Sequence, residues 1–359
     1  MLDSKAGKKL ISLICLLAMC TVFTCCGVQE QERQATAIEP KGKVYFSYFD
    51  TVSYIYDYSG DSAERFDDRS AVVSHILEEY HRLFDIYHEY SGVNNLCTVN
   101  RLAGGEPVPV DEKLVEFLLY AKEMYELSSG QMNIMLGAVL QLWHACREAA
   151  SDSAVKATIP AESALQNAAL HTGIDLLEID SETNTVRIAD PEASIDVGAL
   201  GKGYATEMAA RWLEEQKAFG YVLNIGGNIR IVGNRPDGTG WKTGIRNPLD
   251  PDGEYALNIR IADTACVSSG IYERFFVAEG KKWHHIIDPD TLYPAEWFTG
   301  ITVITRDSGL ADALSTALFC MPYEESSELV SSLDGVEACW FFSDGEQRYS
   351  SGFGKLIED

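Results

Sequence analysis

A carboxylate and a hydroxyl four residues apart are the clearest candidates for metal chemistry in the sequence. Asp312 and Thr316 stand in the run Ala-Asp-Ala-Leu-Ser-Thr, and this spacing places both side chains on one face of a predicted helix. Their oxygens suit a hard cation such as Mg2+, which keeps further positions for water and substrate phosphates. An exposed Asp followed by a Thr that bonds its own helix would give the same pattern, so both interpretations stay open.

Two glycine-containing segments are candidates for close backbone approach to a ligand. Asp196 ends an apolar run and is followed by Val-Gly-Ala-Leu-Gly-Lys-Gly, which contains Lys202. The free N–H groups at a helix start attract phosphate, and a lysine adds positive charge. The spacing matches neither a P-loop nor a Rossmann fingerprint, and a structural strand-to-helix turn is equally compatible. The Gly-Gly-Asn run that ends at Asn228 predicts a tight connection between two strands.

Two adjacent histidines are predicted to lie on one strand of a hairpin. Neighbouring residues of a strand point to opposite faces, so only one of His284 and His285 can face a given site. We expect His284 to be a packed or surface residue. His285 directly precedes Ile-Ile-Asp-Pro and becomes a candidate catalyst only in the company of the other segments.

The elements around these residues predict an α+β architecture. Hairpin-joined strands with helices clustered between them favour this class over a doubly wound sheet. Helical periodicity predicts helices over 62–86, 111–128, 133–150 and 308–320. Strands are predicted over 43–56, 221–232, 241–246, 255–261, 272–278, 282–287 and 301–305.

Composition limits the classes of protein that fit. The chain of 359 residues is 46% hydrophobic, enough for one large domain or two packed halves. A net charge of −25 argues against nucleic-acid binding, because too few cations exist to neutralise phosphates. The cysteines beyond residue 90 form no C-x-x-C pair, so neither a zinc site nor a disulfide framework is expected.

The N-terminus has the pattern of an export signal. Lysines precede a short apolar run that ends before Cys25 and Cys26. We expect residues 1–26 to be a lipoprotein signal peptide with its lipobox, Cys26 to be the acylated residue with Cys25 as the alternative, and 27–42 to be a flexible linker. This predicts a protein lipid-anchored to the cell membrane on its extracytoplasmic face. An uncleaved membrane anchor is the competing interpretation.

Taken together and in this order, the segments resemble the FAD:protein FMN transferase family, often called the ApbE family. Its signatures have the forms D-x-G-[GA]-x-x-K-G-Y, N-x-G-G-D, S-G-x-Y-E-R, H-I-I-D-P and A-D-A-L-S-T, and the resemblance runs over residues 44–341. It implies Mg2+-dependent transfer of FMN from FAD to a Thr or Ser hydroxyl of a target protein, with release of AMP. It also implies an ApbE-like α+β fold over 43–359, with mostly antiparallel or mixed sheets, flanking helices and one compact catalytic unit of two packed halves.

The resemblance assigns roles to individual positions. The Ala199 carbonyl would join Asp312 and Thr316 in holding Mg2+, and His285 would be a base near the reacting hydroxyl. The positions that match flavin contacts are Phe49, Tyr87, Gln131, Met132, Asn133, Asp196, Lys202 and Ile286.

Some positions depart from the family pattern. Asn133 and Met135 replace an Asp and a Thr, Asn228 replaces a frequent Asp, and Leu292 replaces a Gly. Flavin affinity and acceptor docking near Asn133 are the properties that these departures affect. Two alternatives therefore remain: a Mg2+-dependent FAD pyrophosphatase that releases FMN and AMP, and a flavin-binding lipoprotein without turnover. For the transferase, the expected partner is a membrane redox subunit with an Asp-Gly-[Ser/Thr]-Gly-Ala-Thr-like segment.

Overall fold

Strands with alternating burial build the central sheet. In β2 (Thr51–Asp57), Ser53, Ile55 and Asp57 are fully buried and the residues between them are half-buried, as expected for a strand with two different faces. The computed structural model describes residues 40–152 and 156–358. Within them, eight strands form one sheet whose neighbours are all antiparallel. In spatial order these are β1 (Lys41–Tyr48), β2, β6 (Tyr221–Ile225), β7 (Asn228–Val232), β10 (Ala265–Gly270), β13 (Gly300–Thr305), β14 (Glu337–Phe341) and β15 (Gln347–Tyr349).

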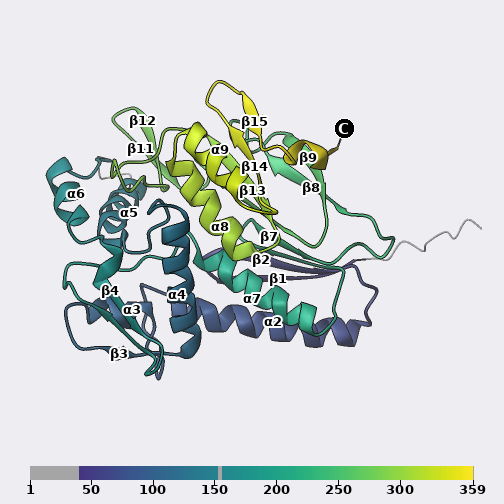
Figure 1. Cartoon of the computed structure of the whole chain (residues 1–359), viewed down its shortest axis with the longest axis horizontal. Coiled ribbons are helices and arrows are strands. Elements are labelled where there is room, and N and C mark those ends of the chain that lie inside the picture. The colour runs from purple at the N-terminus through teal and green to yellow at the C-terminus, as the bar shows by residue number, and fades with distance from the viewer. Residues whose placement is uncertain (1–39, 153–155, 359) are drawn as a thin grey trace, which may run out of the picture. The chain divides into compact units, whose positions relative to one another are not determined.

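The two faces of this sheet pack against different layers. In β10, Ala265 and Val267 belong to the main core, whereas Cys266 belongs to a second apolar cluster with Trp241 and Phe353. Helices cover the first face and a small three-stranded sheet covers the second (Figure 1). The covering elements are α2 (Ala63–Phe84), α7 (Gly201–Glu215), α8 (Ser308–Ala317), α9 (Tyr323–Ser332), β8 (Trp241–Arg246), β9 (Tyr255–Ile261) and β16 (Ile357–Glu358).

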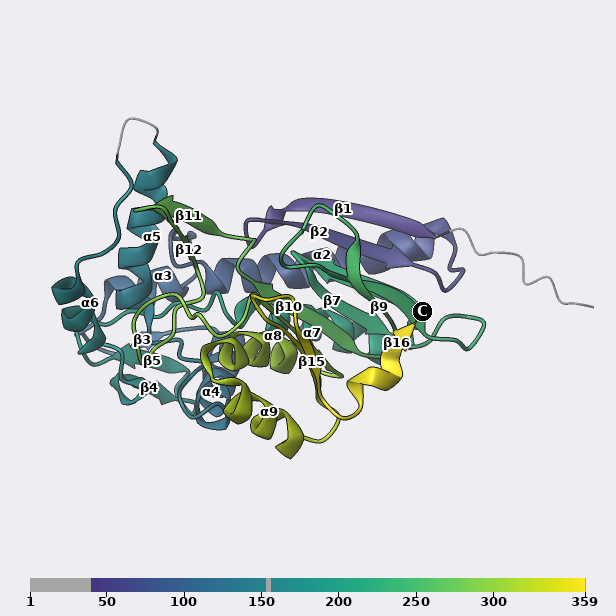
Figure 2. The same cartoon turned by 90° about the horizontal axis from the view of Figure 1, so that it is seen from above.

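The remaining elements form a helical half beside the sheet (Figure 2). Trp143 packs against Trp283 and Phe276, which joins a helix of this half to a two-stranded hairpin. The described residues belong to one compact unit. The elements of this half are α3 (Leu96–Arg101), β3 (Val108–Pro109), α4 (Glu112–Leu127), α5 (Gly137–Ser151), α6 (Glu162–Ala169), β4 (Leu177–Asp180), β5 (Thr185–Ile188), β11 (Phe275–Ala278) and β12 (Lys281–His284).

The prediction of one strand over 43–56 is wrong, because Phe49 and Asp50 form a two-residue turn between β1 and β2. Both residues have positive φ, 53° and 51°, a conformation usually left to Asn-Gly. The Phe49 N–H donates to His81 Nδ1 of α2 over 3.2 Å. The turn is therefore held by a distant helix and has no local sequence signal.

Further boundaries were also predicted wrongly, including that of the strand predicted over 272–278, which begins only at Phe275. The helix predicted over 133–150 starts only at Gly137, because the Asn133 side chain accepts a hydrogen bond from the Met135 N–H and closes a turn. Strand β12 ends at His284, so His285 lies beyond the strand on which it was predicted. The helices predicted over 62–86 and 111–128 and the α+β class are confirmed.

The predictions for the N-terminus concern residues that the structure does not describe. The predicted signal peptide, Cys26 and the predicted linker as far as residue 39 lie outside the described residues. Within the described ranges, no helix combines the length and the apolar character that crossing a membrane requires.

Candidate active site

Segments from both halves of the fold surround one cavity of about 560 Å³. The contributing segments include the β1–β2 and β6–β7 turns, the loop before α5 and α5 itself, the start of α7, strands β8 and β10, the end of β12 and helix α8. The lining includes these residues predicted from the sequence: Gln131, Met132, Asn133, Asp196, Ala199, Lys202, His285, Ile286, Asp312 and Thr316.

Two predicted flavin contacts lie beside the cavity and are not part of its described lining. Phe49 stacks edge-on against His81, and its neighbours Asp50 and Thr51 line the cavity instead. Tyr87 is 57% exposed, and its ring lies 5.6 Å from that of His144, a lining residue. A ligand would have to extend past the described lining to reach either ring.

Helices α7 and α8 cross at Gly203. A Cβ at this position would clash with the Asp312 Cβ and with the Ser308 carbonyl, so only glycine permits this approach. The Gly203 N–H donates to Asp312 Oδ2 over 2.8 Å. The crossing therefore places the Asp312 carboxylate at the start of α7, where the helix dipole favours negative charge.

Three oxygens at this crossing have no partner within the described chain. The Gly203 N–H bonds to Asp312, so the Ala199 carbonyl does not receive the hydrogen bond that a helix would give it. The Thr316 hydroxyl and Asp312 Oδ1 likewise have no described partner within hydrogen-bond distance, although the Asn228 side chain approaches the Asp312 carboxylate. Burial raises the pKa of Asp312, and Lys202 opposes that shift most strongly. A carboxylate buried in this way is stabilised by a bound cation.

Cationic side chains gather along another part of the same cavity. Lys202, Arg147 and Arg274 all line it, and none of them forms an ion pair with a described carboxylate. Burial is the main cause that lowers the pKa of Arg147, and the positive charge of the nearby Arg274 lowers it further. Asp196 lies among them, and burial raises its pKa although Gly198 N–H donates to Oδ1 over 2.8 Å. Closely spaced, unpaired cations favour an anionic ligand.

The two histidines play different structural roles. His284 uses both ring nitrogens: Nε2 bonds to the Ala295 carbonyl over 2.9 Å, and Nδ1 accepts from the Ile286 N–H. His285 Nδ1 contacts the Arg274 carbonyl over 3.2 Å, and since a carbonyl only accepts, Nδ1 must carry the proton. Burial and the nearby Arg274 lower the pKa of His285 to about 3. The ring is therefore neutral, and the lone pair on Nε2 has no partner among the described residues.

The loop before α5 offers one unused acceptor to the cavity. Gln131 Nε2 donates to Asp290 over 2.8 Å, whereas its buried Oε1 has no partner in the described residues. Both ends of the Asn133 amide are used, by Met135 and by the Thr172 carbonyl. Asn133 therefore serves the shape of the loop, and Gln131 is the residue with hydrogen-bonding capacity left.

Sequence reasoning missed several lining residues. Arg147 and His144 lie one turn apart on α5, and Arg246 comes from β8. Nothing local distinguishes them from other charged residues on a helix or strand. Their place at the cavity appears only in the folded chain, where His144 contacts Arg147 and Glu148 and Arg246 pairs with Glu273.

Comparison with known proteins identifies the family. The model of the ApbE family matches residues 51–340. The chain belongs to the ApbE family. A FAD:protein FMN transferase of Treponema pallidum (strain Nichols) is 31% identical over 271 residues, which cover 72% of this chain and 73% of the relative. A protein of the same name from Haemophilus influenzae is 28% identical over 330 residues, 90% of each chain. The prediction of a transferase of this family is confirmed.

Solved structures of the ApbE family have the same fold. The crystal structure of the ApbE protein from Thermotoga maritima has a TM-score of 0.77 and 25% identity, and the match covers 89% of this chain and 100% of that one. The flavin transferase ApbE from Vibrio cholerae has a TM-score of 0.72 at 23% identity. The predicted ApbE-like α+β architecture is therefore confirmed.

The burial of His284 makes the stability of the fold depend on pH. Burial lowers the pKa of His284 to about 4, whereas in the unfolded chain it takes up a proton near 6.5. The unfolded state then binds more protons between these values, so the free energy of unfolding should fall as the pH drops from 6.5 toward 4. Thermal unfolding of His284→Gln should depend less on pH in this window. The exposed His75→Gln serves as the control, and an unchanged slope in His284→Gln would contradict the assignment.

Proposed function

We propose that this chain transfers FMN from FAD to a Ser or Thr hydroxyl of a target protein and releases AMP, in a Mg2+-dependent reaction. The observation that carries the proposal is that one cavity holds a neutral His285 with a free Nε2, three unused oxygens and a set of unpaired cations. A base, a cation site and an anion site are what phosphoryl-type transfer to a hydroxyl requires. The names of the relatives support flavin as the transferred group.

The donor set fits Mg2+. Asp312 contributes a carboxylate, Thr316 a hydroxyl and Ala199 a carbonyl, and each has an oxygen that the described residues leave unused. This donor set is not a cluster of ligating side chains, since no group of three or more His, Cys, Asp or Glu in the described part of the chain is placed to hold a metal. One carboxylate with neutral oxygens is a donor set that suits Mg2+ bound together with substrate phosphates and water. When bound, Mg2+ would neutralise charge on the phosphate oxygens as the pyrophosphate bond breaks.

The protein side chains supply the other parts of the reaction. His285 Nε2 removes the proton of the acceptor hydroxyl, because that hydroxyl is a weak nucleophile while protonated. The acceptor oxygen then bonds to the phosphorus on the FMN side, and the bond from that phosphorus to the AMP oxygen breaks. Lys202 and Arg274 line the same cavity, and their positive charge would stabilise negative charge on AMP. The proposed partner is a membrane redox subunit with an Asp-Gly-[Ser/Thr]-Gly-Ala-Thr-like segment.

The charge of Asp312 should be necessary for transfer. In Asp312→Asn, an oxygen can still accept from the Gly203 N–H, but the charge that would hold Mg2+ is lost. Mass spectrometry of an acceptor peptide mixed with FAD and Mg2+ should show the added FMN with the wild type and no detectable addition with the variant. The exposed Asp334→Asn is the control. Full activity of Asp312→Asn at low Mg2+ would eliminate this metal site.

The same assay separates the transferase from its alternatives. Free FMN and AMP without a labelled acceptor would indicate a pyrophosphatase. FAD binding without any product would indicate a flavin-binding protein.

Loss of the His285 imidazole should affect transfer and leave FAD binding nearly normal. His285→Ala should slow FMN transfer by roughly 10²–10⁴-fold, the usual effect of losing a general base. Its residual rate should rise with pH as the acceptor hydroxyl ionises without help. Because the pKa of His285 is lowered to about 3, the wild type should keep its base deprotonated from pH 8 to pH 5. If FAD binding collapses while turnover per bound FAD is unchanged, His285 is a flavin ligand.

We further propose that the mature protein is lipid-anchored through Cys26 to the extracytoplasmic face of the cell membrane. The basic and apolar pattern before Cys26 supports this. In cells given a labelled fatty acid, Cys26→Ser should yield an unprocessed, unlabelled precursor. Labelling that persists in Cys26→Ser but is lost in Cys25→Ser would assign the modification to Cys25.

A further inference from the structure

The side-chain amide of Asn228 is buried without a hydrogen-bond partner. Asn228 opens β7 directly after the turn from β6, lines the cavity and is only 2% exposed. Its Nδ2 has no described partner within hydrogen-bond distance, although the Asn228 side chain approaches the Asp312 carboxylate. Leaving a buried donor unpaired is destabilising, and such groups in native proteins are usually satisfied by a ligand, an ion or water.

The surroundings determine which end of this amide faces the ligand. The Ser308 hydroxyl donates to Asn228 Oδ1 over 2.8 Å. Since the two ends of an amide point apart, Nδ2 faces away from Ser308 and toward the cavity, which the Asp312 carboxylate also lines. The opposite orientation would set two acceptor oxygens against each other. The N–H end therefore lies on the Asp312 side of the cavity.

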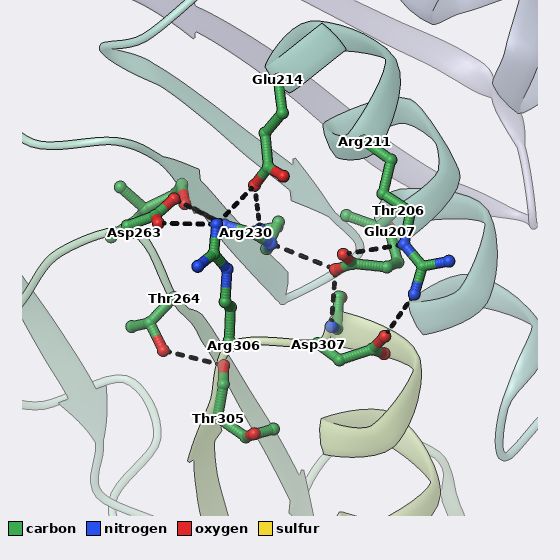
Figure 3. A network of polar contacts seen from close by, with 12 residues as sticks. Thr206, Glu207, Arg211, Glu214, Arg230, Asp263, Thr264, Thr305, Arg306 and Asp307 are labelled. Atoms are coloured by element: carbon green, nitrogen blue, oxygen red, sulfur yellow. Dashed lines mark hydrogen bonds and ion pairs between the residues drawn. The ribbon is translucent and has the colours of Figure 1, made fainter. Parts of the chain in front are cut away.

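A buried ion-pair network holds Ser308, and through it Asn228. Arg230 is fully buried, and its guanidinium bonds to Glu207 over 3.1 Å and to Glu214 over 2.6 Å (Figure 3). Glu207 Oε2 also accepts a hydrogen bond from the Ser308 N–H over 2.8 Å. The network thus ties α7, β7 and the first residue of α8 together behind the cavity. A donor held this firmly costs little conformational entropy when a ligand binds.

We propose that Asn228 is a ligand-binding residue, whose amide donates a hydrogen bond to a phosphate oxygen of the dinucleotide beside Asp312. This assignment rests on the proposed function. The unpaired Lys202, Arg147 and Arg274 on the same cavity favour an anionic group there. The related signature often has Asp at this position, which would only accept hydrogen bonds and would add negative charge next to Asp312. The Asn of this chain provides a neutral donor instead.

Binding measurements without metal test the assignment. We expect Asn228→Ala to bind FAD about 10-fold more weakly than the wild type in the presence of a chelator, the scale of one lost hydrogen bond to a charged group. Binding of riboflavin, which lacks phosphate, should be unchanged. Asn94→Ala is the matched control, because its amide bonds to the Pro109 carbonyl away from the cavity. Flavin fluorescence titration measures each affinity.

The outcomes separate this assignment from the proposed function. If Asn228→Ala binds FAD as tightly as the wild type, or loses riboflavin affinity equally, the phosphate contact is wrong while the transferase can still stand. If the wild type binds no FAD, both fail together. Should Asn228→Ala not fold, Ser308→Ala removes the hydroxyl that orients the amide and should weaken FAD binding in the same direction but less.

A second variant replaces the hydrogen-bond donor at position 228 with a charged acceptor. Asn228→Asp replaces the donor with a second carboxylate near Asp312, so FAD binding without metal should fall at least as far as in Asn228→Ala. Added Mg2+ should restore more FAD affinity in Asn228→Asp than in Asn228→Ala, because the extra carboxylate attracts the cation. A purely structural role for Asn228 would produce no such dependence on Mg2+, and equal recovery of the two variants would count against the proposal.

Discussion

The close crossing of α7 and α8 at Gly203 is the constraint on which the site depends. No side chain fits between the two helices there, so the backbone N–H of Gly203 reaches the Asp312 carboxylate directly. The same contact leaves the Ala199 carbonyl without its helical partner. A single steric requirement thus creates a buried negative charge and exposes an oxygen next to it. The buried Arg230 and Glu207 keep the crossing in place, and removing either partner of such a pair typically costs about 3–5 kcal/mol.

The charged residues of this acidic protein are arranged differently on the surface and at the cavity. Most cations of the described surface are paired with carboxylates, as in the pairs that Arg211 forms with Glu207 and Asp307 (Figure 3). At the cavity the arrangement is different: Arg147 and Arg274 lie near each other and form no ion pair with a described carboxylate, and burial raises the pKa of Asp196 and Asp312. The cavity contains cations and carboxylates that do not neutralise each other fully. It therefore suits a ligand that carries negatively charged groups together with a bound cation.

Burial also separates two histidines that are adjacent in the chain. Both have a lowered pKa, so both are neutral at physiological pH. What distinguishes them is hydrogen bonding: His284 uses both ring nitrogens for the backbone, whereas His285 uses only Nδ1. The free Nε2 makes His285 a candidate base, and the occupied ring of His284 makes it a support for the Ile286 backbone.

The sequence by itself determined the α+β class, most helix and strand positions and the family, because hydrophobic periodicity and short motifs are local properties. It also singled out Asp312, Thr316, Lys202 and His285 by type and spacing. It could not locate the Phe49–Asp50 turn, since a contact from distant His81 holds it. Nor could it reveal that Arg147 bonds to His144 and to no described carboxylate, or that the Asn228 amide is unsatisfied. Whether a polar group has a partner depends on residues far away in the chain, so only the tertiary structure decides it.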